Sequence, residues 1–187
     1  MLVWFVTFVA ARRSEALRLL RPGDDPEASC GPMSLAILAR WHGLEPTIDD
    51  LNRLARVGDS GVSSMRDLRD AATKIGLHAQ AVQLDPTASF PWELPMILHL
   101  REDHFAAVLP VGHDRLVLVD PPDEPRLVDR RWLQGDWKGL ALVVAKSEAV
   151  LTEALGKAGL VKRPSMQGVR QQRDLEAGSH PLTRSKE

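Results

Sequence analysis

The hydrophobic pattern of the chain changes period near residue 77, and no other feature of the sequence constrains the fold as strongly. Before this point, apolar residues follow helical spacing in three successive segments. After it, short apolar runs rich in β-branched residues follow one another, and the first of them alternates apolar and polar positions. Helices first and strands afterwards predict a single α+β domain with an antiparallel sheet.

Start and stop signals bound the predicted elements. The run from Gly31 to His42 is apolar on nearly every face, which predicts a helix buried in the middle of the domain. Two shorter helices begin with capping-box spacing, a hydroxyl side chain followed three residues later by an acidic one. The predicted elements are helices at 31–42, from 48 and from 65, strands at 77–84, 96–100, 105–109, 116–119 and 140–144, a hairpin turn at 112–115 and a short amphipathic helix after Lys146.

The domain is predicted to span residues 22–146, between an apolar segment with a short helix at 1–21 and a short helix with a disordered polar tail at 147–187. The first eleven residues are continuously apolar, whereas a helix that spans a bilayer needs about twenty. A buried element, a shallow membrane anchor and the remnant of a longer segment are all compatible with this run. If the run is an anchor, Arg12 and Arg13 behind it keep the rest of the chain cytoplasmic.

Composition excludes several classes of function. The net charge is −1 and the chain has no tyrosine, so we expect no nucleic-acid partner and no general attraction to an anionic membrane surface. A single cysteine excludes an intrachain disulfide and a Cys-rich zinc site. The thiol of Cys30 is therefore either a small buried hydrophobe or a reactive nucleophile.

The sequence around Cys30 favours the nucleophile. Cys30 directly precedes Gly31 and Pro32 at the start of the predicted central helix. The positive end of the helix dipole favours a thiolate there, and an early proline costs the helix nothing because its missing N–H would be unpaired anyway. The glycine allows a substrate backbone to come close. The alternative is a cysteine that only fills space where the helix begins.

A thiolate nucleophile needs a base within hydrogen-bond reach and a third group that orients the base. His104 begins a strand after a polar turn and can face a cleft at the sheet edge. His99 lies within an apolar strand, where a packed core histidine is the simpler interpretation, and the residues alone rank His104 only slightly higher. Asp120 ends the next strand, so antiparallel pairing can bring it beside His104. Asp120 is otherwise a turn residue that terminates the strand.

Several short motifs follow one another over roughly residues 22–145. They are Cys30-Gly31-Pro32, Trp41-His42-Gly43, the segment 65–69 leading to Gly76-Leu77, the segment 95–99, His104-Phe105, Asp120-Pro121 and Trp137-Lys138-Gly139. Their order and spacing resemble the bacteriocin-processing cysteine peptidases, papain-like domains that cut leader peptides after a double glycine and are often fused to export ATP-binding-cassette transporters. The resemblance implies a papain-like fold with N-terminal helices packed on an antiparallel sheet. It also implies that Cys30, His104 and Asp120 occupy the catalytic positions.

One position departs from the pattern of this family. A glutamine six residues before the cysteine helps to form the oxyanion hole in the family, and Asp24 stands at that position here. The neighbouring Asp25 is no better, because an ionised carboxylate cannot donate a hydrogen bond and repels a developing oxyanion. Loss of one such donor costs about 3–4 kcal/mol of transition-state stabilisation.

The resemblance implies a stand-alone thiol peptidase that cleaves a peptide after small residues, such as a leader peptide, through Cys30, His104 and Asp120. It implies no metal or organic cofactor, an export transporter as partner, and a location in the cytoplasm or at the cytoplasmic face of a membrane. Asp24 favours an alternative, a catalytically weak or inactive peptidase-like domain that binds peptides for an export system. A third hypothesis, a membrane-anchored structural domain, rests only on residues 1–11.

Overall fold

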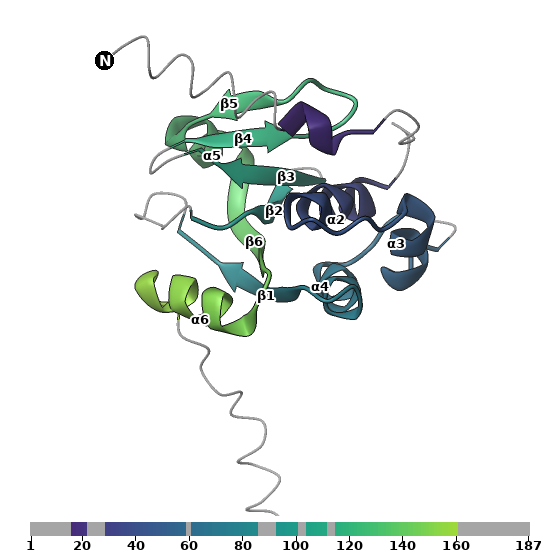
Figure 1. Ribbon diagram of the computed structural model, residues 1–187. Helices are drawn as coiled ribbons and strands as arrows, with labels where there is room; N and C mark the ends of the chain where they lie inside the picture. The colour runs from purple at the N-terminus through teal and green to yellow at the C-terminus, as the bar shows by residue number, and fades with distance from the viewer. Residues whose placement is uncertain are drawn as a thin grey trace, which may run out of the picture.

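A six-stranded antiparallel sheet runs through the centre of the structure, with helices on both of its faces (Figure 1). The computed structural model describes residues 16–21, 29–58, 61–85, 93–100, 104–111 and 115–160. Predictions for residues 1–11, for Asp24 and Asp25, for most of the hairpin turn at 112–115 and for the polar tail lie outside these ranges. The α+β class and the packing of helices on an antiparallel sheet are confirmed.

The strands are arranged in the order β1-β6-β2-β3-β4-β5, so the last strand is inserted between the first two. The elements in chain order are α2 (Cys30–Trp41), α3 (Ile48–Leu54), α4 (Met65–Lys74), β1 (His78–Gln83), β2 (Met96–Leu100), β3 (Phe105–Pro110), β4 (Leu116–Val119), β5 (Arg126–Val128), α5 (Arg130–Asp136), β6 (Trp137–Ala145) and α6 (Glu148–Lys157). A further helical turn covers 16–19.

Helix α2 is buried along almost its whole length, as its apolar sequence predicts. Ten of its residues, from Gly31 to Arg40, are buried, and the helix packs on β3 and, less extensively, on β2. Gly43 follows it at a φ of +80°, a conformation that L side chains rarely adopt. Arg40 donates from Nη1 to the carbonyl of Leu19 at 2.7 Å, which joins the segment 16–21 to this helix.

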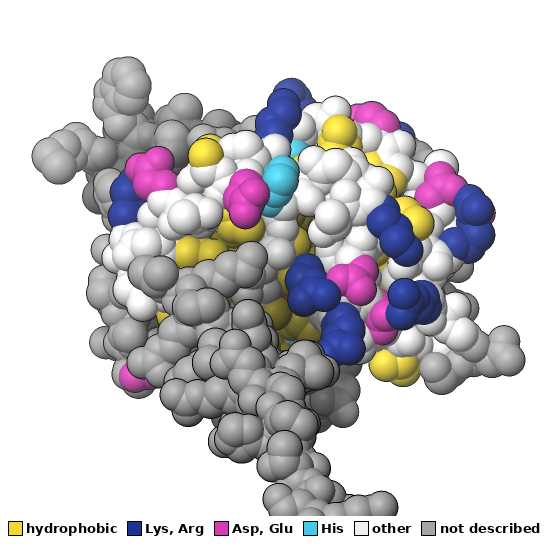
Figure 2. Space-filling model, turned by 90° about the horizontal axis from the view of Figure 1, so that it is seen from below, with side chains coloured by type: hydrophobic (Ala, Val, Ile, Leu, Met, Phe, Trp, Pro, Cys, Tyr) yellow, Lys and Arg dark blue, Asp and Glu magenta, His cyan; other side chains and the backbone are white. Residues whose placement is uncertain are grey.

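Helices α3 and α4 begin at the predicted caps. The Thr47 hydroxyl accepts a hydrogen bond from the Asp50 N–H, and Ser64 and Asp67 form a complete capping box. The face seen from below in Figure 2 carries basic and acidic side chains close together. On α4 itself, Arg69 pairs with Asp70 at 2.7 Å, so neighbouring opposite charges offset each other at this surface.

Alternating side chains of the sheet form two separate core layers. In β3, Phe105 and Ala107 belong to the layer that faces α2, α3 and α4, whereas Ala106 and Val108 belong to the opposite layer with residues of α5 and α6. The period of two along the strand therefore decides which side chains can reach the start of α2. Phe105 lies on that face.

The structure differs from the predicted elements after residue 120. The sequence analysis missed β5 and α5, and β6 begins at Trp137 instead of Leu140. Strand β5 has one buried residue, Val128, so it carries almost no apolar pattern, and pairing with β4 defines it. The helix predicted after Lys146 is present as α6, and its buried residues are Leu151, Ala154 and Leu155. Among the described helices, none is long and apolar enough to cross a bilayer.

Candidate active site

Cys30 is the first residue of α2 and is half-buried. The first turn of α2 contains no acidic residue, and Ser29 before it makes no capping hydrogen bond through its side chain. The positive end of the helix dipole is therefore not neutralised by the helix itself and favours a negative charge on the thiol. The backbone N–H of Phe105 adds a donor, which lies 3.5 Å from Cys30 Sγ.

Adjacent strands bring His104 and Asp120 together. His104 directly precedes β3 and Asp120 directly follows β4, and the two strands are antiparallel with Ala107 opposite Val119. His104 Nε2 lies 2.7 Å from Asp120 Oδ1, and the two side chains are 37% and 23% exposed. The Leu100 N–H donates to the His104 carbonyl at 2.8 Å, which fixes the backbone of the histidine to β2.

A hydrogen bond joins Cys30 to His104 and couples their ionisation. Burial by itself would raise the pKa of the Cys30 thiol, but hydrogen bonds from His104 and from the Phe105 N–H, the positive charge of His104 and the Gly31 N–H together lower it. The hydrogen bond to Asp120 and, second, that to Cys30 raise the pKa of His104 from 6.5 to about 10. Both shifts favour the thiolate–imidazolium form of the pair over the neutral form.

The three side chains form one connected series. Because Nε2 of His104 contacts Asp120, Nδ1 is the ring nitrogen left to face the thiol. A carboxylate, an imidazole and a thiol joined in this way can supply an orienting group, a base and a nucleophile. The structure places Cys30, His104 and Asp120 together as the sequence analysis expected, and their catalytic roles stay a prediction. Asp24, which the resemblance places at the oxyanion position, lies outside the described residues.

Two features of the site were missed by the sequence analysis. The Phe105 donor is a backbone group, so no side-chain pattern indicates it. Gly31 was expected to admit a substrate, but it is also required for packing, because a Cβ there would lie 2.4 Å from Ser63 Oγ and 3.1 Å from a Leu68 methyl group. The small residue beside Cys30 thus lets the loop before α4 pack against the start of α2.

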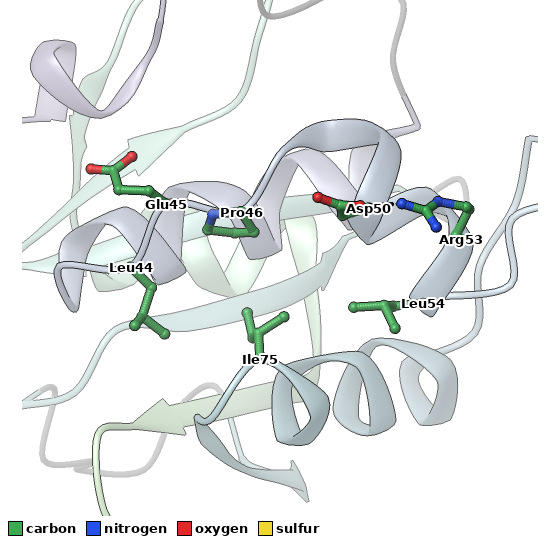
Figure 3. A pocket seen from close by; sticks show the side chains of 7 residues that line it. All are labelled: Leu44, Glu45, Pro46, Asp50, Arg53, Leu54 and Ile75. Carbon is green, nitrogen blue, oxygen red and sulfur yellow. Dashed lines mark hydrogen bonds and ion pairs between the residues drawn. The ribbon is translucent and has the colours of Figure 1, made fainter.

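A cavity of about 400 Å³ is lined by residues 44–46, by α3 and by Ile75, and its lining includes none of Cys30, His104 and Asp120 (Figure 3). Leu44, Leu54 and Ile75 extend into the space between α3 and α4, and Asp50 and Arg53 lie at its border. Helix α2 is about 18 Å long at 1.5 Å per residue. The cavity is therefore separate from the Cys30 site. Within the described ranges, no three His, Cys, Asp or Glu side chains are grouped to hold a metal ion.

Comparison with known proteins identifies relatives that process exported peptides. The chain is 26% identical over 126 residues to the probable microcin-H47 secretion/processing ATP-binding protein MchF of Escherichia coli. It is 26% identical over 128 residues to the colicin V secretion/processing ATP-binding protein CvaB of the same species. The matches cover 67% and 68% of this chain but only 18% of each relative, so the chain spans less than a fifth of their length.

Solved structures show the same fold. The peptidase domain of Streptococcus ComA, a bi-functional ABC transporter, superposes with a TM-score of 0.55 at 25% identity, covering 67% of this chain and 96% of that domain. A double glycine motif protease from an AMS/PCAT transporter, solved with the leader peptide, has a TM-score of 0.54 at 19% identity and covers 67% of this chain and 88% of that one. This second likeness supports the fold alone.

The family profile matches most of the chain and includes all three side chains of the site. The profile of the Peptidase C39 family covers residues 24–149, which contain α2 to β6 and the residues Cys30, His104 and Asp120. The resemblance to bacteriocin-processing peptidases is confirmed by this match together with the relatives. The chain belongs to the Peptidase C39 family, whose members are generally cysteine peptidases.

Proposed function

We propose that the protein is a thiol peptidase in which Cys30 is the nucleophile, His104 the general base and acid, and Asp120 the group that orients His104. The observation that carries this proposal is the connected series from the Cys30 thiol through the His104 ring to the Asp120 carboxylate. A cysteine that merely fills space would not need a hydrogen-bonded imidazole whose other nitrogen is held by a carboxylate. The lowered thiol pKa and the raised histidine pKa have the directions that nucleophilic catalysis requires.

The proposed reaction has two steps. The Cys30 thiolate attacks the scissile carbonyl carbon, and the His104 imidazolium gives its proton to the leaving amine as the C–N bond breaks. The resulting thioester is attacked by a water whose proton passes to His104, and the breaking C–S bond returns the thiolate. The backbone N–H groups of Cys30 and Gly31 precede the first intrahelical hydrogen bond of α2, and in this scheme they stabilise the oxyanion. The scheme uses no metal or organic cofactor.

The proposed substrate is a peptide that is cut after small residues, such as an export leader peptide. Two relatives are described as secretion/processing proteins, and a structural neighbour is described as a double glycine motif protease in complex with a leader peptide. These descriptions support an export ATP-binding-cassette transporter as the partner and the cytoplasmic side of a membrane as the place of action. Both remain part of the proposal for this chain.

Asp24 supports a second candidate, a peptidase-like domain that binds peptides for an exporter with little turnover. At the family's oxyanion position, a carboxylate opposes the tetrahedral intermediate but does not prevent peptide binding. The two candidates therefore share a peptide partner and differ in the rate of the chemical step.

Labelling with a peptide that ends in glycine aldehyde tests the proposal. A peptide aldehyde adds reversibly to a thiol, the hemithioacetal is most stable where the site binds the peptide and activates the thiol, and Cys30 is the only cysteine in the chain. We expect labelling of the wild type at neutral pH, a strong reduction in His104→Ala, and normal labelling in a matched control, His78→Ala, which replaces an exposed histidine of β1. Equal labelling of wild type and His104→Ala would contradict the assignment of His104 as the partner of the thiol.

A further inference from the structure

A second histidine lies next to the proposed active site and has no part in the reaction scheme. His99 is opposite Phe105 in the pairing of β2 with β3, and the two ring centroids are 5.0 Å apart with an interplanar angle of 40°. This is a normal geometry for two packed rings. Phe105 is 5% exposed, and its backbone N–H is the donor to Cys30 Sγ. The His99 ring thus packs directly on the residue that supplies a hydrogen bond to the thiol.

The backbone around His99 is irregular on the side away from Phe105. The pairing of β2 with β6 shifts register between Leu98 and Leu100, which pair with Ala141 and Trp137. Gly139 lies within this irregular stretch of β6 at a φ of +91°, and a Cβ there would lie 2.0 Å from the Leu84 carbonyl oxygen. Such bulges change the direction of a side chain and are frequent beside active sites. The shift occurs at the position where an apolar strand carries its one polar side chain.

We propose that His99 is a positioning residue for Cys30, because its ring holds Phe105 where the Phe105 N–H reaches Sγ. The inference rests on the proposed function only in taking Cys30 as the reactive thiol. A displacement of Phe105 by a few tenths of an ångström would lengthen its N–H···Sγ hydrogen bond beyond the present 3.5 Å and weaken it. His104, the preceding residue, is held separately, because the Leu100 N–H bonds its carbonyl and Asp120 contacts its ring. His99 and Leu100 therefore support the donor and the base from the same strand.

Among the described residues, the charged groups that act on the thiol are those of the site itself. His104 faces Cys30 from the start of β3, and Asp120 acts from the end of β4 through His104. Helix α2 has no acidic residue in its first turn. The N–H of Phe105 is one of the interactions that lower the thiol pKa, so its loss should raise that pKa while the contact of His104 with Asp120 remains.

Direct titration of the thiolate by its ultraviolet absorbance tests the proposal. The chain has one cysteine and no tyrosine, so neither a second thiolate nor a phenolate contributes to the signal. In His99→Ala we expect a higher thiol pKa and an alkylation rate by iodoacetamide at pH 7 that is about three- to tenfold lower, the size expected for one lost hydrogen bond. In His99→Phe, which keeps the ring, both properties should stay near wild type. His78→Ala is the matched control on β1 and should change neither.

Three results would overturn the inference. The first is a thiol titration in His99→Ala that matches His78→Ala, and the second is a loss in His99→Phe as large as in His99→Ala. If His99→Ala does not fold, His99→Leu replaces it, because leucine fills the space without an aromatic face. The third result is a thiol titration in folded His99→Leu that matches the wild type. Alkylation requires no peptide cleavage. Failure of the proposed function therefore appears as absent hydrolysis by wild type, whereas failure of the inference appears as an unchanged thiol in His99→Ala.

Discussion

Replacing Asp120 with asparagine tests the electrostatic basis of the site. Asp120 Oδ1 lies 2.7 Å from His104 Nε2, and this hydrogen bond is the largest cause of the raised pKa of His104. Asparagine has nearly the same shape but no charge. The variant should therefore keep the position of the ring and lose the interaction that favours its protonated form.

The size of the effect follows from the histidine pKa and its exposure. The pKa of His104 rises from 6.5 to about 10, and one pKa unit corresponds to about 1.36 kcal/mol. The whole rise cannot be assigned to Asp120, because Cys30 is the second cause and because water screens a side chain that is 37% exposed. We expect Asp120→Asn to lower the pKa of His104 by about one to two units, or about 1.4–2.7 kcal/mol after this discount.

Histidine proton resonances followed against pH measure this change, with His104 assigned from the spectrum of His104→Ala. The chain has six histidines, so the five others serve as internal controls. The raised pKa also predicts that this ion pair stabilises the fold fully below pH 6.5 and that its contribution is lost as the pH rises towards 10. The difference in unfolding free energy between wild type and Asp120→Asn should shrink over that range. A wild-type His104 that titrates near 6.5, or an unchanged pKa in the variant, would refute the reasoning.

Three further changes give separate expectations. Asp24→Gln should raise peptidase turnover about ten- to a thousandfold with little change in KM, because the new donor acts on the transition state. Steady-state kinetics on a double-glycine peptide measure this change, and an unchanged kcat would mean that the oxyanion hole is built elsewhere. Gly31→Ala should lower the free energy of unfolding in urea by about 1–3 kcal/mol, because its Cβ would lie 2.4 Å from Ser63 Oγ. A urea midpoint equal to that of the wild type would show that the loop carrying Ser63 moves aside without cost. Deleting 162–187 should leave Tm within about one to two degrees, given its polar composition, and a larger loss in calorimetry would mean that the tail docks on the domain.

The elements with a strong apolar pattern could be predicted from the sequence. The buried helix was expected at 31–42 and is found at Cys30–Trp41, and the strands Met96–Leu100 and Leu116–Val119 have the predicted bounds. In each of these elements nearly every side chain is buried, so local composition and tertiary environment agree. β5 could not be predicted in this way, because two of its three residues are exposed and its hydrogen bonds to β4 define it.

The position of Cys30, the proposed nucleophile, could be predicted more readily than that of His104, the proposed base. Cys30 was found from a local signal, a cysteine before Gly31 and Pro32 at a helix start, and the structure places it there. The choice between His104 and His99 depends on where each side chain lies relative to Asp120. The pairing of β3 with β4 in the sheet decides this position. Both lie near Phe105 at the same end of the β2–β3 hairpin, and it is His104 Nε2 that lies 2.7 Å from Asp120 Oδ1. The resemblance to the family made this distinction, since residue spacing could not.

Cleavage of a double-glycine peptide by the wild type and by Cys30→Ala, followed by mass spectrometry, tests the central claim most directly. Cys30 is half-buried at the start of α2, and alanine keeps the helix, so both proteins should be folded by circular dichroism and should bind the peptide. We predict that the wild type cuts after the small residues and that a covalent thioester on Cys30 is trapped by rapid acid quenching, whereas Cys30→Ala releases no product. Equal cleavage by both proteins, or peptide binding without cleavage by the wild type, would contradict the assignment of this chain as a thiol peptidase.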